Sequence, residues 1–356
     1  MINRPADRDR YPERVAHVRD LVARDDAALA AELVGLAADN DDVWRFDGAE
    51  VRRIVETLPP ARRDDLILRV TAVATGGGEG RHPVPVGSLL HWLGRGLRAA
   101  DLSGAAGAVL IGAASRRPTG VPAELAVLGE VAVRENGEVP PGLLAVMRRS
   151  ARWMAPLAGD LRSFLDDPAE PLNAGEVWAE AANAAAARDE TVRALIAHAL
   201  RSKGAAPSAK WSKEAVALTA SAGRAESRAL IHGWFTLVPR ERTIALGGDY
   251  GYDVDAVLDV HNAEALRGLL HVIAVTRAEP GDAEAVGALA HHAAEKVPGY
   301  GPRSPIVANA AVLTLESLGD RSALAELRRL RAAGPMPGMA RRLDQAIARR
   351  AAALNA

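Results

Sequence analysis

The fold is indicated most clearly by residues 261–276, HNAEALRGLLHVIAVT, and by residues 281–295, GDAEAVGALAHHAAE. In both stretches apolar side chains recur at positions i, i+3, i+4, i+7 and i+8, which is the spacing of one face of an α-helix. These side chains are Leu266, Leu269, Leu270, Ile273 and Ala274 in the first stretch, and Val286, Leu289, Ala290, Ala293 and Ala294 in the second. Residues 189–202 repeat the pattern. We therefore predict an all-α protein.

The starts of the predicted helices are marked by capping residues. Asn262 is expected to cap the first of the helices quoted above, and Ser304 to cap a helix over 305–318. Two more helices are predicted after it, over 320–332 and 336–353. The resulting helix pairs repeat at roughly 44 residues, a period in the HEAT and armadillo range. The sequence thus predicts an α-solenoid of HEAT/armadillo-like antiparallel helix hairpins in a right-handed superhelix.

Three stretches interrupt the helical pattern. They are a glycine run at 76–80 (GGGEG), a proline-containing segment at 166–171 (DDPAEP) and a long loop at 238–260. The second predicts a division into an N-terminal α-helical domain, 1–167, and a C-terminal HEAT-like domain, 174–356, with one continuous solenoid as the alternative.

Composition excludes several classes of protein. The chain has 356 residues, 44 basic against 45 acidic side chains and a formal charge of −1, so it lacks the overall basic charge typical of nucleic-acid-binding proteins. It contains no cysteine, which excludes disulfides, thiolate metal sites and a cysteine nucleophile. No apolar run is long enough to span a membrane, and the charged N-terminus does not resemble a signal peptide. We expect a cytoplasmic protein without membrane contact.

No motif predicts catalysis. The glycine run is not followed by the lysine that a phosphate-binding loop requires, and we interpret it as a linker. The acidic residues of the long loop, Asp249, Asp253, Asp255 and Asp259, lack the pattern of a calcium-binding hand. The adjacent pair His291 and His292 diverges around a helix and does not have the spacing of zinc ligands. We expect no catalytic residue, no metal and no cofactor.

One group of residues points to binding. Arg267 and His271 lie four residues apart on one flank of the helix over 261–276, and Lys296 and Arg303 frame a turn with Gly299 and Gly301 that leads into the next helix. Glycines, a helix start and two cations can together bind an anion or an acidic peptide. The alternative is that Arg303 pairs with a carboxylate of the neighbouring hairpin and fixes the loop. The predicted binding residues are Arg267, His271, Lys296 and Arg303, and the predicted structural residues are Asn262, Gly299, Gly301 and Asn309.

The same region resembles a known family. Residues 262–270 (NAEALRGLL), 299–304 (GYGPRS) and 308–311 (ANAA) are similar to the helical, HEAT-like region of MolR-like bacterial proteins of unknown function, some of which carry a WGR domain. The resemblance covers approximately residues 205–355, and the Trp-Gly-Arg signature itself is absent. It implies a helical module and brings no catalytic residue.

These observations predict a non-enzymatic helical-repeat scaffold that binds a protein or peptide partner, possibly an acidic one, on a concave face. Nucleic-acid binding, including a DNA glycosylase-like role, is one alternative, because residues 321–356 carry eight arginines against Glu326 and Asp344. A helical-bundle enzyme with a pocket between helices is another.

Overall fold

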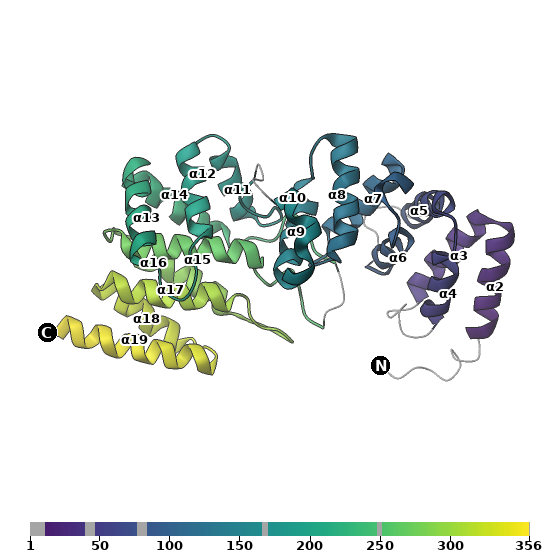
Figure 1. Ribbon diagram of the computed structural model, residues 1–356. Helices are drawn as coiled ribbons and strands as arrows, with labels where there is room; N and C mark the ends of the chain where they lie inside the picture. Colours follow the sequence, from purple (N-terminus) through teal and green to yellow (C-terminus); the bar gives the residue numbers. More distant parts are fainter. Residues whose placement is uncertain (1–10, 40–46, 77–83, 166–169, 248–250, 356) are drawn as a thin grey trace. The chain divides into compact units, whose positions relative to one another are not determined.

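The computed structural model describes residues 11–39, 47–76, 84–165, 170–247 and 251–355. Within these ranges the protein is helical apart from its connections and one short hairpin, which confirms the prediction of an all-α protein (Figure 1). The chain divides into two compact units, Met1–Asp166 and Asp167–Ala356. Each unit has a hydrophobic core of its own.

The first unit consists of consecutive helices. Its elements are α2 (Tyr11–Arg24), α3 (Asp26–Asp39), α4 (Asp47–Glu56), α5 (Pro60–Thr75), α6 (Val84–Gly94), the short 3-10 helix η1 (Ala99–Asp101), α7 (Gly104–Ser115), α8 (Pro122–Asn136), α9 (Pro141–Trp153), the 3-10 helix η2 (Ala155–Leu161) and α10 (Arg162–Leu165). From α5 onward, each α-helix up to α8 packs against the next one in sequence, and α5 and α7 also pack against the next but one.

Small residues bring α7 and α8 close together. Ser103 caps α7 by accepting a hydrogen bond from the backbone N–H of Ala106, and the helix continues through Gly104 and Gly107. A Cβ atom at Gly107 would lie 2.4 Å from Cγ1 of Val131 on α8, so a larger residue here would force the two helices apart. This close approach fixes the positions of two of the three helices that form the site described below.

The second unit contains the helices on which the fold prediction was based. Its elements are α11 (Val177–Ala186), α12 (Glu190–Leu200), α13 (Ala209–Ser221), α14 (Arg224–Leu237), α15 (Val260–Val275), α16 (Asp282–Ala294), the strands β1 (Lys296–Val297) and β2 (Gly301–Pro302), α17 (Pro305–Leu318), α18 (Arg321–Ala332) and α19 (Pro337–Asn355). The helices α15 to α19 coincide with the five predicted helices to within two residues at each end, and Ser304 caps α17 as predicted.

Two local features of the second unit differ from the prediction. The cap of α15 is Asp259 rather than Asn262, because the Asp259 carboxylate accepts hydrogen bonds from the backbone N–H groups of His261 and Asn262. The glycine-rich turn after α16 forms an antiparallel hairpin in which Lys296 pairs with Pro302 and Val297 with Gly301.

The long loop predicted over 238–260 lies outside the helices where it is described, except for Val260, because α14 ends at Leu237 and α15 begins at Val260. Residues 248–250 of this loop, 77–80 of the glycine run and 166–169 of the interdomain segment lie outside the described residues.

Candidate functional site

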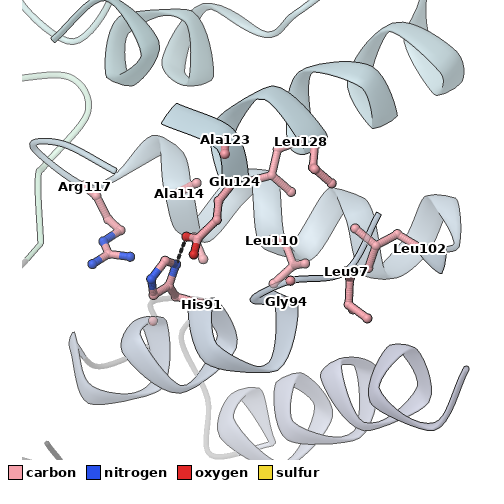
Figure 2. Close-up of a pocket in the computed structure, with 14 residues that line it drawn as sticks. His91, Gly94, Leu97, Leu102, Leu110, Ala114, Arg117, Ala123, Glu124 and Leu128 are labelled. Atoms are coloured by element: carbon pink, nitrogen blue, oxygen red, sulfur yellow. Dashed lines mark ion pairs between the residues drawn. The ribbon is translucent and has the colours of Figure 1, made fainter. Parts of the chain in front are cut away.

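A pocket of about 180 Å³ lies between α6, α7 and α8 in the first unit (Figure 2). Most of its wall is apolar or small. The lining residues of this kind are Leu97, Leu102, Leu110, Val127 and Leu128, together with Gly87, Gly94, Gly96, Ala113, Ala114 and Ala123. His91, Arg117 and Glu124 complete the lining and lie together at one end, whereas Leu97 and Leu102 lie at the other.

The pocket exists because small residues occupy positions where larger ones would fill it. A Cβ atom at Gly94 would lie 2.8 Å from Cδ1 of Leu110, so a side chain there would displace Leu110. On α7, Ala113 and Ala114 face the cavity where longer apolar side chains would occupy it. Gly87 has no other atom within 4 Å of the position that a Cβ would take. The cavity is therefore a property of the local sequence.

The end of α6 is held by a buried arginine of α5. Arg63 is 5% exposed, and its guanidinium donates hydrogen bonds to the carbonyl oxygens of Leu93 (2.9 Å) and Trp92 (3.3 Å) and also to that of Arg95. Cations stabilise the carbonyl end of a helix, where the last C=O groups have no partner within the helix. Arg63 thereby fixes Gly94 and the segment that leads to Leu97, two residues of the pocket wall.

The polar end of the pocket holds an unusual carboxyl group. Oε2 of Glu124 lies 3.2 Å from Nδ1 of His91, and Oε1 lies 3.7 Å from Nε of Arg95. The Glu124 side chain is 22% exposed, and its buried Oε2 atom makes no hydrogen bond to any described residue. A buried oxygen without a hydrogen bond is unfavourable and is one of the features that mark a binding site.

Burial controls the ionisation of both groups. It raises the pKa of Glu124 above its ordinary value, against the opposing effect of Arg95 and Arg117. Burial, together with the positive charges of Arg117 and Arg95, lowers the pKa of His91 to about 4. His91 is therefore uncharged at neutral pH, with one ring nitrogen as donor and the other as acceptor.

This arrangement is suited to binding. Among the described lining residues there is no serine, threonine, lysine or tyrosine that could act as a nucleophile. The described residues also contain no group of three or more histidine, aspartate or glutamate side chains that could hold a metal ion. What remains is an apolar cavity with groups that form hydrogen bonds and ion pairs at one end, which is typical of sites that recognise a mostly apolar group.

A second cluster of buried polar groups lies in the other unit. The Glu176 carboxylate accepts hydrogen bonds from Nε1 of Trp178 (2.9 Å), Nδ2 of Asn262 (2.9 Å) and the backbone N–H of Asp259 (2.7 Å), and Nη1 of Arg242 lies 3.3 Å away. Burial and the neighbouring carboxylate of Asp259 raise the pKa of Glu176. The cluster ties the loop before α15 to the start of α11, and its hydrogen bonds are made within the protein. We assign it to the stability of the fold.

The predicted binding residues of α15 are engaged in internal contacts. Nη2 of Arg267 donates a hydrogen bond to the carbonyl oxygen of Ser202 and lies 3.8 Å from Oε1 of Glu264. His271 is 1% exposed, and its Nδ1 lies 2.7 Å from Oγ of the same Ser202. Both side chains thus attach α15 to Ser202, which lies two residues after the end of α12.

The predicted binding residues of the hairpin lie in a separate group. Nε of Arg303 donates to Oε2 of Glu295 at 2.8 Å, and Nη1 donates to the carbonyl oxygen of Ala256 at 2.8 Å. Such contacts are expected if the role of Arg303 is to fix the loop. Lys296 is exposed on β1. Within the described part of the chain, no hydrogen bond or ion pair joins Arg303 or Lys296 to Arg267 or His271.

The predicted structural residues lie in three parts of the second unit: the hairpin, the buried polar cluster and α17. Gly299 and Gly301 have φ angles of +80° and +131°, and a Cβ at Gly299 would lie 2.5 Å from the carbonyl oxygen of Gly251. Asn262 is fully buried, and its side-chain amide bonds both the backbone of Asn173 and the carboxylate of Glu176. Asn309 is half-buried on α17.

The basic C-terminal end carries several internal ion pairs. Arg329 pairs with Glu326 at 2.6 Å, Arg331 with Asp344 at 2.7 Å and Arg349 with Glu316 at 2.5 Å. These pairs compensate part of the positive charge that suggested contact with nucleic acid. In the described ranges, no helix is long and apolar enough to cross a membrane.

The residues of the pocket are not among those that the sequence pointed to. His91, Arg117 and Glu124 come from three different segments, and their spacing along the chain carries no motif. The available signal was the concentration of glycine and alanine around His91 and along α7, which is also compatible with simple close packing of helices. No family model, curated protein or solved structure matches the chain, so the resemblance to MolR-like proteins stays a prediction.

Proposed function

We propose that the chain is a non-enzymatic helical-repeat binding scaffold for a protein or peptide partner, and that the partner inserts one apolar side chain into the pocket between α6, α7 and α8. The observation that carries the proposal is the preformed apolar cavity with a polar end (Figure 2). Partner proteins commonly contribute a few anchor side chains that fill such pockets and supply most of the binding energy.

The size of the pocket favours a single side chain over a whole cofactor or substrate. Its volume of about 180 Å³ is below the roughly 300–1,000 Å³ of pockets that enclose a drug-sized ligand. The polar groups lie at one end only, so the buried part of the occupant is apolar and its polar part faces His91, Arg117 and Glu124. An anchor residue of a partner chain has this form.

We further propose that the hairpins stack as in a HEAT-like α-solenoid. In the second unit α16 packs against both α17 and α18, and α17 packs against both α18 and α19. Contact with the next helix and the next but one supports a stack of hairpins, an architecture that presents extended surfaces to partners. The proposal places the partner's anchor on the first unit rather than on the predicted residues around α15.

Selection of peptides tests this function. Random peptides with free C-termini are displayed and selected on the immobilised full chain, and the recovered peptides are titrated against two alanine-to-leucine variants of α7. Ala114→Leu places extra methyl groups in the pocket, whereas Ala108→Leu makes the same change on the exposed face of the same helix. We expect selected peptides to bind the Ala108→Leu variant like the wild type and the Ala114→Leu variant at least about tenfold more weakly.

Two results would contradict the proposal. Peptides that bind the Ala114→Leu variant as tightly as the wild type would exclude the pocket as the anchor site. A selection that enriches no peptide over the uncoated support would contradict the scaffold function. Thermal unfolding of both variants shows whether either substitution disturbs the fold.

A further inference from the structure

The polar end of the pocket contains a cation without a counterion. Arg117 lies two residues after the end of α7 and is half-buried, and its guanidinium makes no hydrogen bond or ion pair with any described residue. Its backbone is nevertheless held in place, because Nη2 of Arg149 donates to its carbonyl oxygen at 3.0 Å and its own N–H donates to Ala114. Figure 2 shows the Arg117 guanidinium on the same side of the pocket as the His91 ring and the Glu124 carboxyl group.

The charges around this end add to a positive balance. Two guanidinium groups, those of Arg117 and Arg95, are close enough for their charges to lower the pKa values of His91 and Glu124. Against them stands the carboxyl group of Glu124. The carboxylate of Glu56 lies 3.9 Å from Nη1 of Arg95, but it is closer to Arg52, whose Nε is 3.3 Å from the same Oε1 and offsets its charge. Arg95 already approaches Glu124 to 3.7 Å, so the charge that is left without compensation is that of Arg117. A neutral His91 adds a hydrogen-bonding group and no charge.

The apolar wall and this free cation together define the occupant. An apolar side chain would fit between Leu110 and Leu128, and an anionic group attached to it would face Arg117 at the end of the pocket. The C-terminal residue of a peptide has both parts on one α-carbon, an apolar side chain and a free carboxylate. An internal residue of a partner chain has the side chain without the charge.

We propose that the pocket recognises the C-terminal residue of its partner, with an apolar side chain in the cavity and the α-carboxylate paired with the Arg117 guanidinium. This inference rests on the proposed function, since it specifies which part of a partner chain the scaffold binds. In this arrangement Glu124 limits affinity, because its carboxyl group stands close to the incoming carboxylate. Arginine and a carboxylate form charge-assisted hydrogen bonds, often two in parallel.

Binding of small molecules distinguishes the contribution of the carboxylate from that of the apolar side chain. Full-length protein labelled with ¹³C at the leucine methyl groups is titrated with N-acetyl-L-leucine and with N-acetyl-L-leucinamide, which differ only in the terminal group, a carboxylate in one and an uncharged amide in the other. We expect both probes to shift the methyl signals of Leu97, Leu110 and Leu128, and the acid to bind about tenfold more tightly than the amide. The tetrapeptide N-acetyl-Ala-Ala-Ala-Leu, with a free carboxylate, is expected to bind at least as well as N-acetyl-L-leucine.

Two variants act in opposite directions if the inference is correct. Arg117→Gln removes the cation and is expected to abolish the preference for the acid, so that acid and amide bind the variant about equally. Glu124→Gln removes the competing carboxyl group and is expected to strengthen binding of the acid several-fold. If the pocket preferred a cationic group, Glu124→Gln would weaken binding instead. Unfolding midpoints close to that of the wild type show that both variants are folded.

The outcomes distinguish this inference from the proposed function. Equal binding of acid and amide overturns the role of the carboxylate while leaving an apolar anchor pocket. Binding of N-acetyl-L-leucine but not of the tetrapeptide overturns the peptide C-terminus and identifies a small free acid as the ligand. An absence of shifts with all three probes contradicts the pocket as an anchor site, and with it the proposed function.

Discussion

The side-chain amide of Asn262 on α15 donates a hydrogen bond of 2.9 Å to the buried carboxylate of Glu176, which lies 86 residues earlier in the chain. The same amide bonds the backbone of Asn173 in both directions, accepting from its N–H at 2.8 Å and donating to its carbonyl oxygen at 3.0 Å. One asparagine therefore attaches the long α15 helix to the segment that precedes α11. Since all three residues are buried, water cannot replace these bonds.

Removal of this amide is expected to destabilise the second unit strongly. Asn262→Ala removes three buried hydrogen bonds, one to the Glu176 carboxylate and two to the backbone of Asn173, at a loss of about 2–4 kcal/mol in the free energy of unfolding. Urea unfolding followed by far-UV circular dichroism measures the loss. Asn309→Ala, at a half-buried position on α17, is the matched control, with an expected loss below about 1 kcal/mol. Equal losses for the two variants would contradict the role assigned to Asn262.

A glycine of α15 is expected to be indispensable for a different reason. A Cβ atom at Gly268 would lie 2.1 Å from the carbonyl oxygen and 2.5 Å from the Cα of Ala199, so the backbones of α12 and α15 are in direct contact there. Gly268→Ala must separate the two helices, and we expect the free energy of unfolding to fall by about 3 kcal/mol despite the higher helix propensity of alanine.

The control for Gly268 is Gly287 on α16. Its added Cβ would meet the carboxylate end of Glu326, a flexible side chain that can turn away. Gly287→Ala is therefore expected to change the free energy of unfolding by less than about 1 kcal/mol. Chemical unfolding measures the free energy of unfolding of both variants. A Gly268→Ala protein as stable as the Gly287→Ala protein would show that α12 and α15 separate at little cost.

The helices could be predicted because their signal is local. Apolar side chains at helical spacing and caps such as Ser304 lie within one turn of the structure they specify, and the five helices from α15 to α19 were located to within two residues at each end. The cap of α15 shows the limit of this reasoning. Asp259 and Asn262 are both good capping residues, and the choice between them is made by Glu176, whose position depends on the tertiary structure.

The pocket could not be predicted, because its parts carry no local signal. His91, Arg117 and Glu124 are each ordinary residues for a helix end or a helix surface. Their meeting depends on how closely α6, α7 and α8 approach one another, which is set by Gly94 and Gly107 against side chains of other helices. The positions of Arg267 and His271 on one helix flank were predictable, whereas the contact that both make with Ser202 was not.

The buried guanidinium of Arg63 is expected to support both the stability of the first unit and the shape of the pocket. Its planar fork reaches the carbonyl oxygens of Trp92, Leu93 and Arg95 together, which the compact ammonium of lysine cannot do. Arg63→Lys should lower the free energy of unfolding by about 1–3 kcal/mol and weaken binding of N-acetyl-L-leucine. Arg69→Lys, an exposed position on the same helix, should change neither quantity. Equal behaviour of the two variants in unfolding and titration would exclude this role of Arg63.

The buried imidazole of His271 is expected to make the stability of the second unit dependent on pH. Burial, together with the charge of Arg267, lowers its pKa from 6.5 to about 4. Between these two values the unfolded chain binds a proton that the folded chain does not, so stability is complete above pH 6.5 and is lost as the pH falls towards 4. The loss from this residue is on the order of 3 kcal/mol.

The variant His271→Gln isolates this contribution. At pH 7 it should be less stable than the wild type, because it gives up the 2.7 Å contact with Ser202 and the ring contact with Trp211. At pH 4.5 the difference in the free energy of unfolding should narrow by about 2–3 kcal/mol, since only the wild type has a buried imidazole that resists protonation. Urea unfolding of both proteins at the two pH values measures this change. Because the other titrating groups are common to both proteins, a difference that is the same at pH 7 and pH 4.5 would mean that His271 accepts its proton as readily in the folded chain as in the unfolded one.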